Sequence, residues 1–257
     1  MVAKGFKGVL PSVVARAMGA RRRFSTTYAA GEAWTSCLDG AGLAAARPSD
    51  VTHDVLNQSR PLSDYNAFEV EPMLHEVLAA AGGEWAAPSL TSLGAHVGCD
   101  TWQAEARAAN RHVPIHVSHD GFGRRIDVVE YHPSYHSLMG LALESGVSSF
   151  AWDPANAGRS GAHTARAGLM YLMYQLECGV CCPTTMTFAA TPALAFGAST
   201  AVADAWMPLL TAPAYDHRDI PIALKRGATL GMSMTEKQGG SGQPYKIQPS
   251  PIALFPK

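Results

Sequence analysis

Apolar residues recur at helical spacing over much of the chain. The first run ends at Gly82 and Gly83, and its apolar residues recur at helical spacing: Phe68, Val70, Met73, Leu74, Val77 and Leu78. A second run begins near Ser89 and continues, with a break near Gly98, to Asn110. We therefore predict two helices that pack in the core of the protein.

Two further helices follow from the same pattern. Residues 133–144 begin with a proline, which suits the first turn of a helix. Residues 162–178 carry apolar side chains over a face too broad for a surface helix, so we predict that this helix is central and buried. We place Arg159 and Arg166 on its opposite side, and we expect the carboxylate of Glu177 at its end to be solvated.

The remaining segments predict shorter elements. Residues 123–136 contain alternating apolar side chains, which suits a short extended segment. Residues 182–192 look like a loop between prolines, in which Thr185 and Thr187 could either reach a ligand or cap the next helix. Residues 193–210 predict one or two short helices, and residues 228–234 predict a strand.

Composition and charge narrow the class of protein. The chain is 47% hydrophobic and rich in alanine, which suits a helical globule, and its net charge is −1. Nucleic-acid binders usually carry a strong basic field, so we predict no nucleic-acid partner for this chain. No apolar run reaches the roughly 18–20 residues that a membrane helix requires. We expect a mainly α fold without a membrane partner.

Residues 1–50 read differently from the rest. The first 31 residues contain lysines and arginines but no acidic residue, and the first acid is Glu32. An arginine-rich, hydroxyl-rich and acid-free start is typical of a mitochondrial transit peptide, although a disordered basic tail of a cytoplasmic protein has the same composition. We predict a mitochondrial protein, with a cytoplasmic one as the alternative. Residues 1–50 are assigned as a disordered leader and linker.

Histidines and cysteines raise a metal-binding hypothesis. His112, His116 and His119 occur in a segment broken by proline and have no helical register. Cys178 and Cys181 have a C-x-x-C spacing, but a zinc site needs a second ligand pair. We therefore assign no metal ligands, and a histidine–metal protein is kept only as a third hypothesis.

Chemistry is concentrated in the stretch from residue 231 to residue 241. An extended chain that runs into Gly239 and Gly240 can lay its backbone against a flat ligand, because no Cβ atom stands in the way. Thr235 and Ser241 can each donate a hydroxyl hydrogen bond on either side of the glycines. The stretch therefore predicts a ligand-binding edge built from backbone.

The order of residues in this stretch carries a family resemblance. Met-Thr-Glu-Lys-Gln-Gly-Gly-Ser at 234–241 resembles the Thr-Glu-x-x-x-Gly-Ser signature of the acyl-CoA dehydrogenases, and its Lys-Gln-Gly variant is similar to the AidB branch of adaptive-response flavoproteins. The stretches Gly-Arg-Arg-x-Asp-x-Val-x-x-His-Pro-x-x-His from Gly123 and Cys-Pro-x-Thr-Met-Thr-Phe-Ala-Ala-Thr-Pro from Cys182 are similar to that branch as well. The resemblance covers residues 52–241.

The resemblance implies a cofactor, a substrate class and a site. The cofactor would be FAD, with the edge of the flavin ring lined by Met234, Thr235, Gly239, Gly240 and Ser241. Ser241 would also bind the substrate, meeting the thioester arm of an acyl-CoA. In the family a carboxylate base removes an α-proton while the β-hydride passes to the flavin, and that base lies in a C-terminal domain. The sequence therefore offers no catalytic residue to assign. The complete protein is expected to be a homo-oligomer.

The chain departs from the family pattern after Ser241. Four prolines in residues 242–257 exclude a central strand there, so this segment is assigned as a divergent proline-rich tail. We expect an acyl-CoA dehydrogenase-like N-terminal helical domain at 51–226 and the first strand of a truncated flavin-binding β-domain at 227–241. Such a portion would not be catalytically competent alone. The alternative is a non-catalytic helical interaction module or a truncated gene product.

Overall fold

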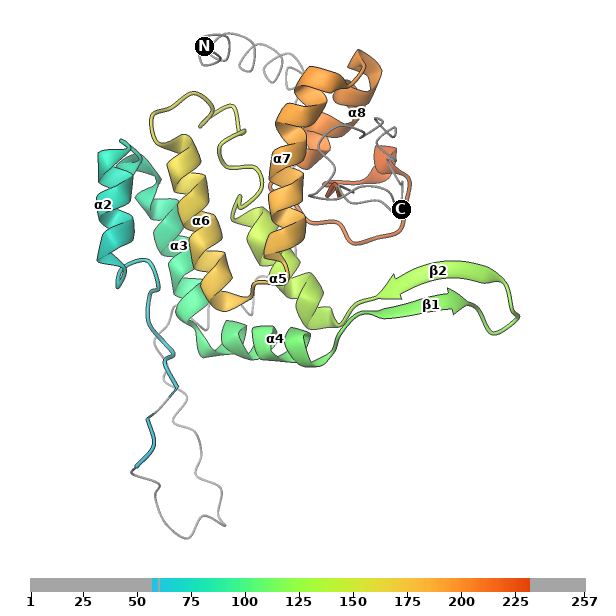
Figure 1. The fold of residues 1–257 in the computed structure, drawn as a ribbon, viewed down its shortest axis with the longest axis horizontal. Coiled ribbons are helices and arrows are strands. Elements are labelled where there is room, and N and C mark those ends of the chain that lie inside the picture. Colours follow the sequence, from blue (N-terminus) through green and yellow to red (C-terminus); the bar gives the residue numbers. More distant parts are fainter. Residues whose placement is uncertain (1–56, 60, 232–257) are drawn as a thin grey trace, which may run out of the picture.

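The computed structural model describes residues 57–59 and 61–231, and this part of the chain is mostly helical (Figure 1). Helices cover most of it, and one pair of strands forms a small sheet. In chain order the elements are α2 (Pro72–Ala80), the 3₁₀ helix η1 (Glu84–Ala86), α3 (Ala87–Gly98), α4 (Asp100–Arg111), β1 (Ile115–His119), β2 (Arg125–Glu130), α5 (Pro133–Glu144), α6 (Ala162–Leu176), α7 (Cys181–Gly197), α8 (Thr200–Leu210) and the 3₁₀ helix η2 (Ile222–Leu224). The predicted mainly α fold is confirmed.

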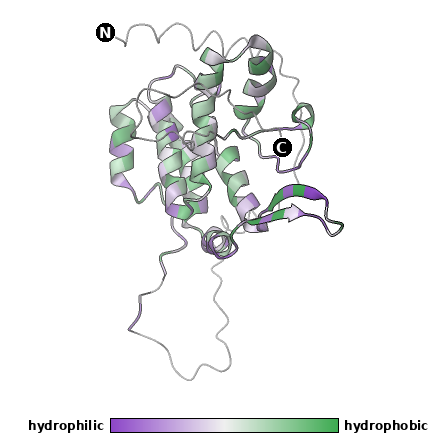
Figure 2. Cartoon of the chain, turned by 45° about the vertical axis from the view of Figure 1, so that its right-hand side comes forward, coloured by the Kyte–Doolittle hydropathy of each residue, from purple (hydrophilic) through white to green (hydrophobic). Residues whose placement is uncertain are grey.

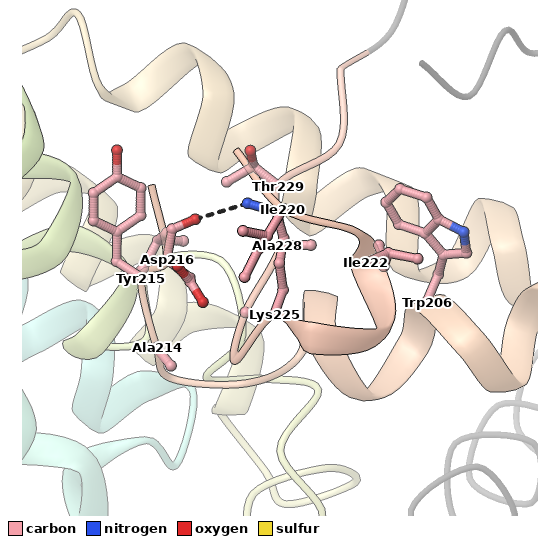
Figure 3. A pocket seen from close by; sticks show the side chains of 11 residues that line it. Trp206, Ala214, Tyr215, Asp216, Ile220, Ile222, Lys225, Ala228 and Thr229 are labelled. Atoms are coloured by element: carbon pink, nitrogen blue, oxygen red, sulfur yellow. Dashed lines mark hydrogen bonds between the residues drawn. The ribbon is translucent and has the colours of Figure 1, made fainter. Parts of the chain in front are cut away.

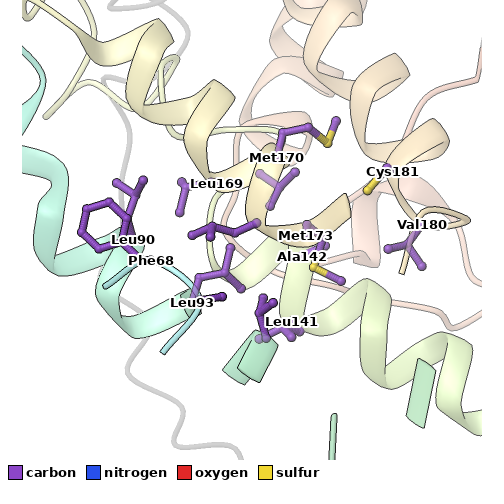
Figure 4. Packing of buried hydrophobic residues seen from close by; sticks show 14 of the residues in the cluster. Phe68, Leu90, Leu93, Leu141, Ala142, Leu169, Met170, Met173, Val180 and Cys181 are labelled. Carbon is purple, nitrogen blue, oxygen red and sulfur yellow. The ribbon is translucent and has the colours of Figure 1, made fainter. Parts of the chain in front are cut away.

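Helix α6 organises the body of the molecule. It lies between α3 on one side and α7 on the other, while α4 packs on α5 and α7 packs on α8 (Figure 1). Figure 4 shows Leu169 of α6 on the side of Leu90 and Leu93 of α3, whereas Met170 extends toward Cys181 of α7. All five side chains belong to one large buried cluster, so the prediction of a central buried helix is confirmed. One stripe of α6 remains exposed, along Tyr171 and Tyr174.

The predicted break near Gly98 has a steric cause. The backbone amide of Asp64 donates to the carbonyl of Gly98 at 2.6 Å, so the entering chain crosses the end of α3 at close range. A Cβ atom on Gly98 would collide with the carbonyl oxygen of Tyr65. Only glycine fits this crossing, and α4 then begins at Asp100 in a new direction.

Two predictions about α6 were wrong. Arg166 was placed on the polar side, but it is only 9% exposed and its Nε donates to the carbonyl oxygen of Val147 at 2.7 Å. Glu177 was expected to be solvated, but its carboxylate is buried and accepts from the amides of Gly179 and Val180 at 2.7 and 2.8 Å. It thereby satisfies the amides of the two residues that lead into α7.

The predicted loop at 182–192 is also wrong, because these residues form most of α7. Pro183 lies in the first turn, where its missing amide hydrogen costs nothing. Pro192 lies inside the helix and leaves the carbonyl of Phe188 without its usual donor. The indole Nε1 of Trp152 donates to that carbonyl oxygen at 3.1 Å. The tertiary hydrogen bond replaces the missing helical one and lets α7 continue.

The strands form a hairpin that projects from the helical body (Figure 1). Its register pairs Ile115 with Glu130 and Val117 with Val128 in antiparallel fashion. The predicted extended segment corresponds to β2, whereas β1, which was read as a proline-broken loop, was missed. Figure 2 shows hydrophobic and hydrophilic colours alternating along this arm. At its tip, Phe122 is 88% exposed.

Other predictions concern residues that lie wholly or partly outside the described part of the chain. Residues 228–231 belong to no helix or strand, and the rest of the predicted strand, 232–234, lies outside the described part of the chain. The leader (1–50) and the tail (242–257) lie outside it too. Within residues 57–59 and 61–231, no helix is long and apolar enough to cross a membrane.

Candidate functional site

The five residues predicted to line the flavin, Met234, Thr235, Gly239, Gly240 and Ser241, lie outside the described residues. What the structure does describe is the segment that leads to them, residues 227–231. The amide of Leu230 donates to the hydroxyl of Thr187 at 3.2 Å, and the amide of Ala228 donates to the carbonyl oxygen of Leu209 at 3.2 Å. These two bonds hold the approach segment, which we define as residues 227–231, against α7 and α8.

Thr187 is a central residue of this arrangement. Its side chain is fully buried, and its hydroxyl donates to the carbonyl oxygen of Pro183 at 2.8 Å while accepting from Leu230. The hydroxyl of Thr185 faces the sulfur of Met170 at 4.0 Å. Neither hydroxyl caps a helix, which was one of the two predicted roles. Thr187 instead links α7 to the segment that precedes the predicted ligand edge.

A small apolar cluster lies beneath the approach segment. It consists of Ala190, Leu194, Met207 and Leu210 from α7 and α8, with Ala228 and Leu230 packed against it. Gly227, at the start of the approach segment, passes so close to Ala214 that a Cβ atom would collide with the Ala214 carbonyl oxygen. Packing and steric fit therefore fix the path of the chain up to residue 231.

A cavity of about 100 Å³ lies beside the approach segment (Figure 3). Its walls come from the end of α5, from α8 and from the loop between α8 and residue 229, and they include Trp206, Tyr215, Ile222 and Thr229. Small-molecule sites in proteins usually enclose roughly 300 Å³ or more. The cavity is therefore too small for a flavin or an acyl-CoA, and the described residues support the predicted site without enclosing it.

Asp216 is the polar centre of that loop. Its carboxylate accepts from Nε and Nη2 of Arg218 at 2.7 and 2.6 Å and from the amide of Arg226 at 3.1 Å. Lys225 Nζ donates to the Asp216 carbonyl oxygen at 3.1 Å, the bond drawn in Figure 3. The hydrogen bonds from Arg218 hold the pKa of Asp216 well below its usual range. The carboxylate therefore stays ionised and serves the framework rather than acting as a base.

A group of aromatic rings and histidines lies at the base of the hairpin. His136 Nδ1 and the hydroxyl of Tyr215 are 2.7 Å apart, and the rings of His136 and His217 lie 4.7 Å apart. Burial, together with the nearby His217, lowers the pKa of His136, so its ring is neutral near pH 7. Burial raises the pKa of Tyr135, which stacks on Tyr131, to about 12. These residues form a hydrogen-bonded aromatic surface, and none of them was predicted.

The described residues do not gather metal ligands. No group of three His, Cys, Asp or Glu side chains in this part of the chain could hold a metal ion. His116 instead contacts the carboxylate of Asp127 at 3.2 Å, and the ring of His112 stacks on His132. Burial raises the pKa of the Cys181 thiol to about 12, which disfavours the thiolate that a metal or a nucleophilic reaction requires.

The fold and the approach segment together define a class of protein. The structure is similar to the Bd2924 apo-form, with a TM-score of 0.61 and 25% identity, over 71% of this chain and 35% of that one. It is also similar to a crystal structure of Caenorhabditis elegans ACDH-11 in complex with C11-CoA, with a TM-score of 0.58 and 20% identity over 76% of this chain and 33% of that one. The class is the N-terminal helical domain of acyl-CoA dehydrogenase-like proteins.

The family follows from the sequence comparison. The chain belongs to the adaptive response protein AidB N-terminal domain family, which it matches over residues 57–217. It is 40% identical over 190 residues to the Escherichia coli (strain K12) protein named "Putative acyl-CoA dehydrogenase AidB". That alignment covers 74% of this chain and 35% of the relative, so the chain spans about a third of the length of the curated relative it matches.

Proposed function

We propose that the chain is an N-terminal portion of an FAD-dependent acyl-CoA dehydrogenase-like flavoprotein. In this proposal Met234, Thr235, Gly239, Gly240 and Ser241 line the edge of the flavin. The observation that carries it is the hydrogen bond from the Leu230 amide to Thr187. It holds the chain against α7 at Leu230, four residues before Met234 in the sequence.

In this proposal the described residues position the segment that binds FAD, but they do not enclose the cofactor. Gly227 and the small apolar cluster fix the path of the chain, and the cavity beside it is too small to hold the ring. The flavin would therefore lie beyond residue 231, against the backbone of the two glycines. FAD, when bound, supplies the two-electron acceptor, and the Thr235 hydroxyl is suited to hydrogen-bond a flavin heteroatom.

An acyl-CoA-type molecule is the proposed substrate class. The Ser241 hydroxyl would bind the thioester arm, and the solved complex of ACDH-11 with C11-CoA supports this class of ligand for a protein of similar fold. Because the chain spans about a third of its curated relative, we propose catalysis for the whole protein rather than for these residues alone.

Titration of the purified chain with FAD tests the proposal, with flavin fluorescence and the visible absorbance band as readouts. We expect saturable binding that Thr235→Val weakens roughly fivefold through the loss of one hydrogen bond. Gly240→Val should weaken it further, because a branched side chain would stand between the backbone and the ring. Thr229→Val is the matched control, since Thr229 precedes the signature in the same segment and should leave binding unchanged.

Two results would count against this assignment. One is a chain that leaves the flavin spectrum unchanged at saturating FAD. The other is an affinity that is the same in Thr235→Val, Gly240→Val and the Thr229→Val control. Either result would favour the alternative of a non-catalytic helical interaction module.

We also propose that the complete protein forms a homo-oligomer. Apolar side chains of the hairpin are exposed, among them Ile115, Phe122 and Val128 at 61, 88 and 40%. An isolated two-stranded hairpin is marginally stable in water, so an additional covering surface would stabilise it. Light scattering of the complete protein after size-exclusion chromatography should give a mass above that of one subunit, and a monomeric mass would contradict this.

We further propose a mitochondrial location, because the acid-free basic start of the chain is typical of a transit peptide. A fluorescent reporter fused to the first residues of the chain, up to about position 40, should enter mitochondria. A diffuse cytosolic signal would favour the cytoplasmic alternative.

A further inference from the structure

Arg166 of α6 has a buried guanidinium group that lacks a carboxylate partner. Its Nε donates to the carbonyl oxygen of Val147, and its Cζ lies 3.9 Å from the centroid of the Phe188 ring on α7. Its Nη2 is buried and has no hydrogen-bond partner in the described part of the chain. No ion pair to a described Asp or Glu offsets the charge.

Two buried hydroxyl groups lie on the segments that surround this guanidinium. Ser148 directly follows Val147, whose carbonyl holds Arg166, and Thr191 lies about one turn after Phe188 on α7. Both residues are fully buried, and neither side-chain oxygen has a partner among the described residues. Together with Nη2 of Arg166 they are the buried side-chain polar atoms without a partner in residues 57–59 and 61–231.

Aromatic side chains pack around Arg166. Trp152 stacks on Phe188 with ring centroids 5.1 Å apart, and His163 approaches Trp152 edge-on at 4.9 Å. Trp152 is buried and Phe188 is half-buried, whereas His163 is exposed, so the cluster reaches the surface on the His163 side. The pKa of His163 is lowered, by burial and by the charge of Arg166, so its ring adds no second positive charge near pH 7.

Arg166 and the approach segment both contact α7. Phe188, which stacks under the guanidinium, directly follows Thr187, which holds the amide of Leu230. A ligand bound beside the approach segment could therefore extend along α7 toward Arg166.

A buried charge without a partner is costly, and water satisfies hydroxyl groups better than it neutralises a guanidinium. A carboxylate suits all three orphan atoms, because it accepts from the planar guanidinium fork and from two hydroxyls. We propose that Arg166, Ser148 and Thr191 form a carboxylate-binding site that receives the far end of a carboxyl-terminated acyl chain. The acyl part of this inference rests on the proposed function, whereas the carboxylate site does not.

The carboxylate site is tested first with glutarate alone. Thermal unfolding of the full chain in sodium glutarate is compared with sodium chloride at matched ionic strength. We expect glutarate to raise the unfolding temperature of the wild type, Arg166→Lys to retain part of the rise, and Arg166→Met to lose it. Arg159→Met is the matched control, because Arg159 also stacks on an aromatic ring, that of Trp85 at 3.5 Å, but is exposed.

The stability of Arg166→Met without ligand separates a binding role from a structural one. If Arg166 is kept as a receptor, removal of its unpaired charge leaves the variant at least as stable as the wild type. Two results together would overturn the carboxylate site. Arg166→Met would be less stable than the wild type, and the unfolding temperature of the wild type would be the same in glutarate and in chloride.

The acyl part is tested with two thioesters, glutaryl-CoA and butyryl-CoA, by calorimetric titration. Glutaryl-CoA should bind about tenfold more tightly, as expected for a charge-assisted pair, and Arg166→Met should abolish this preference while butyryl-CoA binding stays unchanged. A glutarate response without any thioester binding would support the carboxylate site and contradict the proposed function. Equal binding of both thioesters, with no glutarate response, would overturn the carboxylate site and leave the proposed function standing.

Discussion

The described chain contains two apolar clusters of different size, and only the smaller one contacts the approach segment. The larger cluster runs from Ala67, just before α2, to Cys181 at the start of α7, and contains fully buried side chains such as Leu90, Leu138 and Leu169. The smaller one joins α7 to α8 through Ala190, Leu194, Met207 and Leu210. The approach segment packs only on the smaller cluster. The part of the chain that leads to the predicted ligand edge is therefore held by the thinner core.

The junction between α6 and α7 differs from the α3–α6 interface in polarity. Apolar side chains fill the α3–α6 interface, whereas Arg166, Glu177, Thr184, Thr187 and Thr191 are all buried at or near α7. Buried polar groups are costly unless they are satisfied, so their concentration here is more typical of a binding region than of a stability core. The comparison teaches that α7 joins the helical body through buried polar contacts as well as through apolar packing.

Truncation of a leucine in each cluster gives the largest expected effect. Leu169→Ala removes a fully buried side chain from the large cluster, so we expect a loss of about 3–5 kcal/mol in the free energy of unfolding. Leu194→Ala, in the small cluster, should cost about 2 kcal/mol, because Leu194 has fewer buried neighbours that would line the cavity left behind. Chemical denaturation measures both.

Hydrogen exchange locates the helices that each leucine substitution destabilises. Leu169→Ala should reduce amide protection throughout α2 to α6, whereas Leu194→Ala should reduce it only in α7, α8 and the approach segment. The comparison of the two cores would be wrong if Leu194→Ala lowered protection equally in α3 and α6.

A glycine in the large cluster region offers the second test. Gly161 has φ +73°, and a Cβ atom there would collide with the backbone of Gly82 and Gly83, where the turn after α2 meets the start of α6. Gly161→Ala should therefore cost about 2–3 kcal/mol. Gly158→Ala is the control, because Gly158 has φ +81° but no atom within 4 Å of the added Cβ, so only the strain of about 1 kcal/mol should appear. Equal losses in the two variants would show that the close packing at Gly161 adds nothing.

The large cluster could be predicted from the sequence, because helical spacing alone identifies most of it. The apolar periodicity of residues 162–176, the break at Gly98 and the proline start of α5 all give the correct elements. The prediction overshoots where an apolar position faces solvent, as at Val70 and Met73, which are 62 and 63% exposed. Periodicity identifies the apolar face of a helix, but it does not show how much of that face other elements bury.

The smaller region could not be predicted in the same way, because tertiary contacts decide it. Pro192 was read as a helix breaker, but the indole of Trp152, 36 positions before Phe188, supplies the hydrogen bond that lets α7 continue. Arg166 was placed opposite the apolar face of its helix, but the carbonyl of Val147 and the ring of Phe188 hold it in the interior. The Asp-x-Arg spacing at 216–218 was the available hint for the Asp216 pair, whereas the bond between Thr187 and Leu230 leaves no sequence pattern.

Asp216→Asn tests the loop that leads into the approach segment. The carboxylate is almost completely buried and accepts from two nitrogens of Arg218. Loss of its charge should cost about 1–3 kcal/mol and should loosen residues 213–227. Chemical denaturation at neutral pH measures the loss, and limited proteolysis of the loop locates it.

The pH dependence of the free energy of unfolding tests whether the ionised form of Asp216 stabilises the fold. Because folding lowers the pKa of Asp216 below its ordinary value of 3.8, the ionised carboxylate contributes its full stability above that pH. The contribution is lost as the pH falls below 3.8, so the difference between wild type and Asp216→Asn should be constant near neutrality and shrink in acid. A difference that grew on acidification would contradict the ion-pair account.

Thr187→Val is expected to have the smallest effect on stability and is the sharpest test of the site. The substitution keeps the buried volume but removes the hydroxyl that accepts from Leu230 and donates to the Pro183 carbonyl, so we expect a loss of about 1 kcal/mol. Hydrogen exchange at the Leu230 amide should accelerate, while amides in α3 and α6 should be unchanged. Thr187→Ser, which keeps the hydroxyl, should preserve the slow exchange at Leu230. If Leu230 exchanges at the same rate in wild type, Thr187→Val and Thr187→Ser, then the smaller core alone holds the approach segment and α7 contributes only packing.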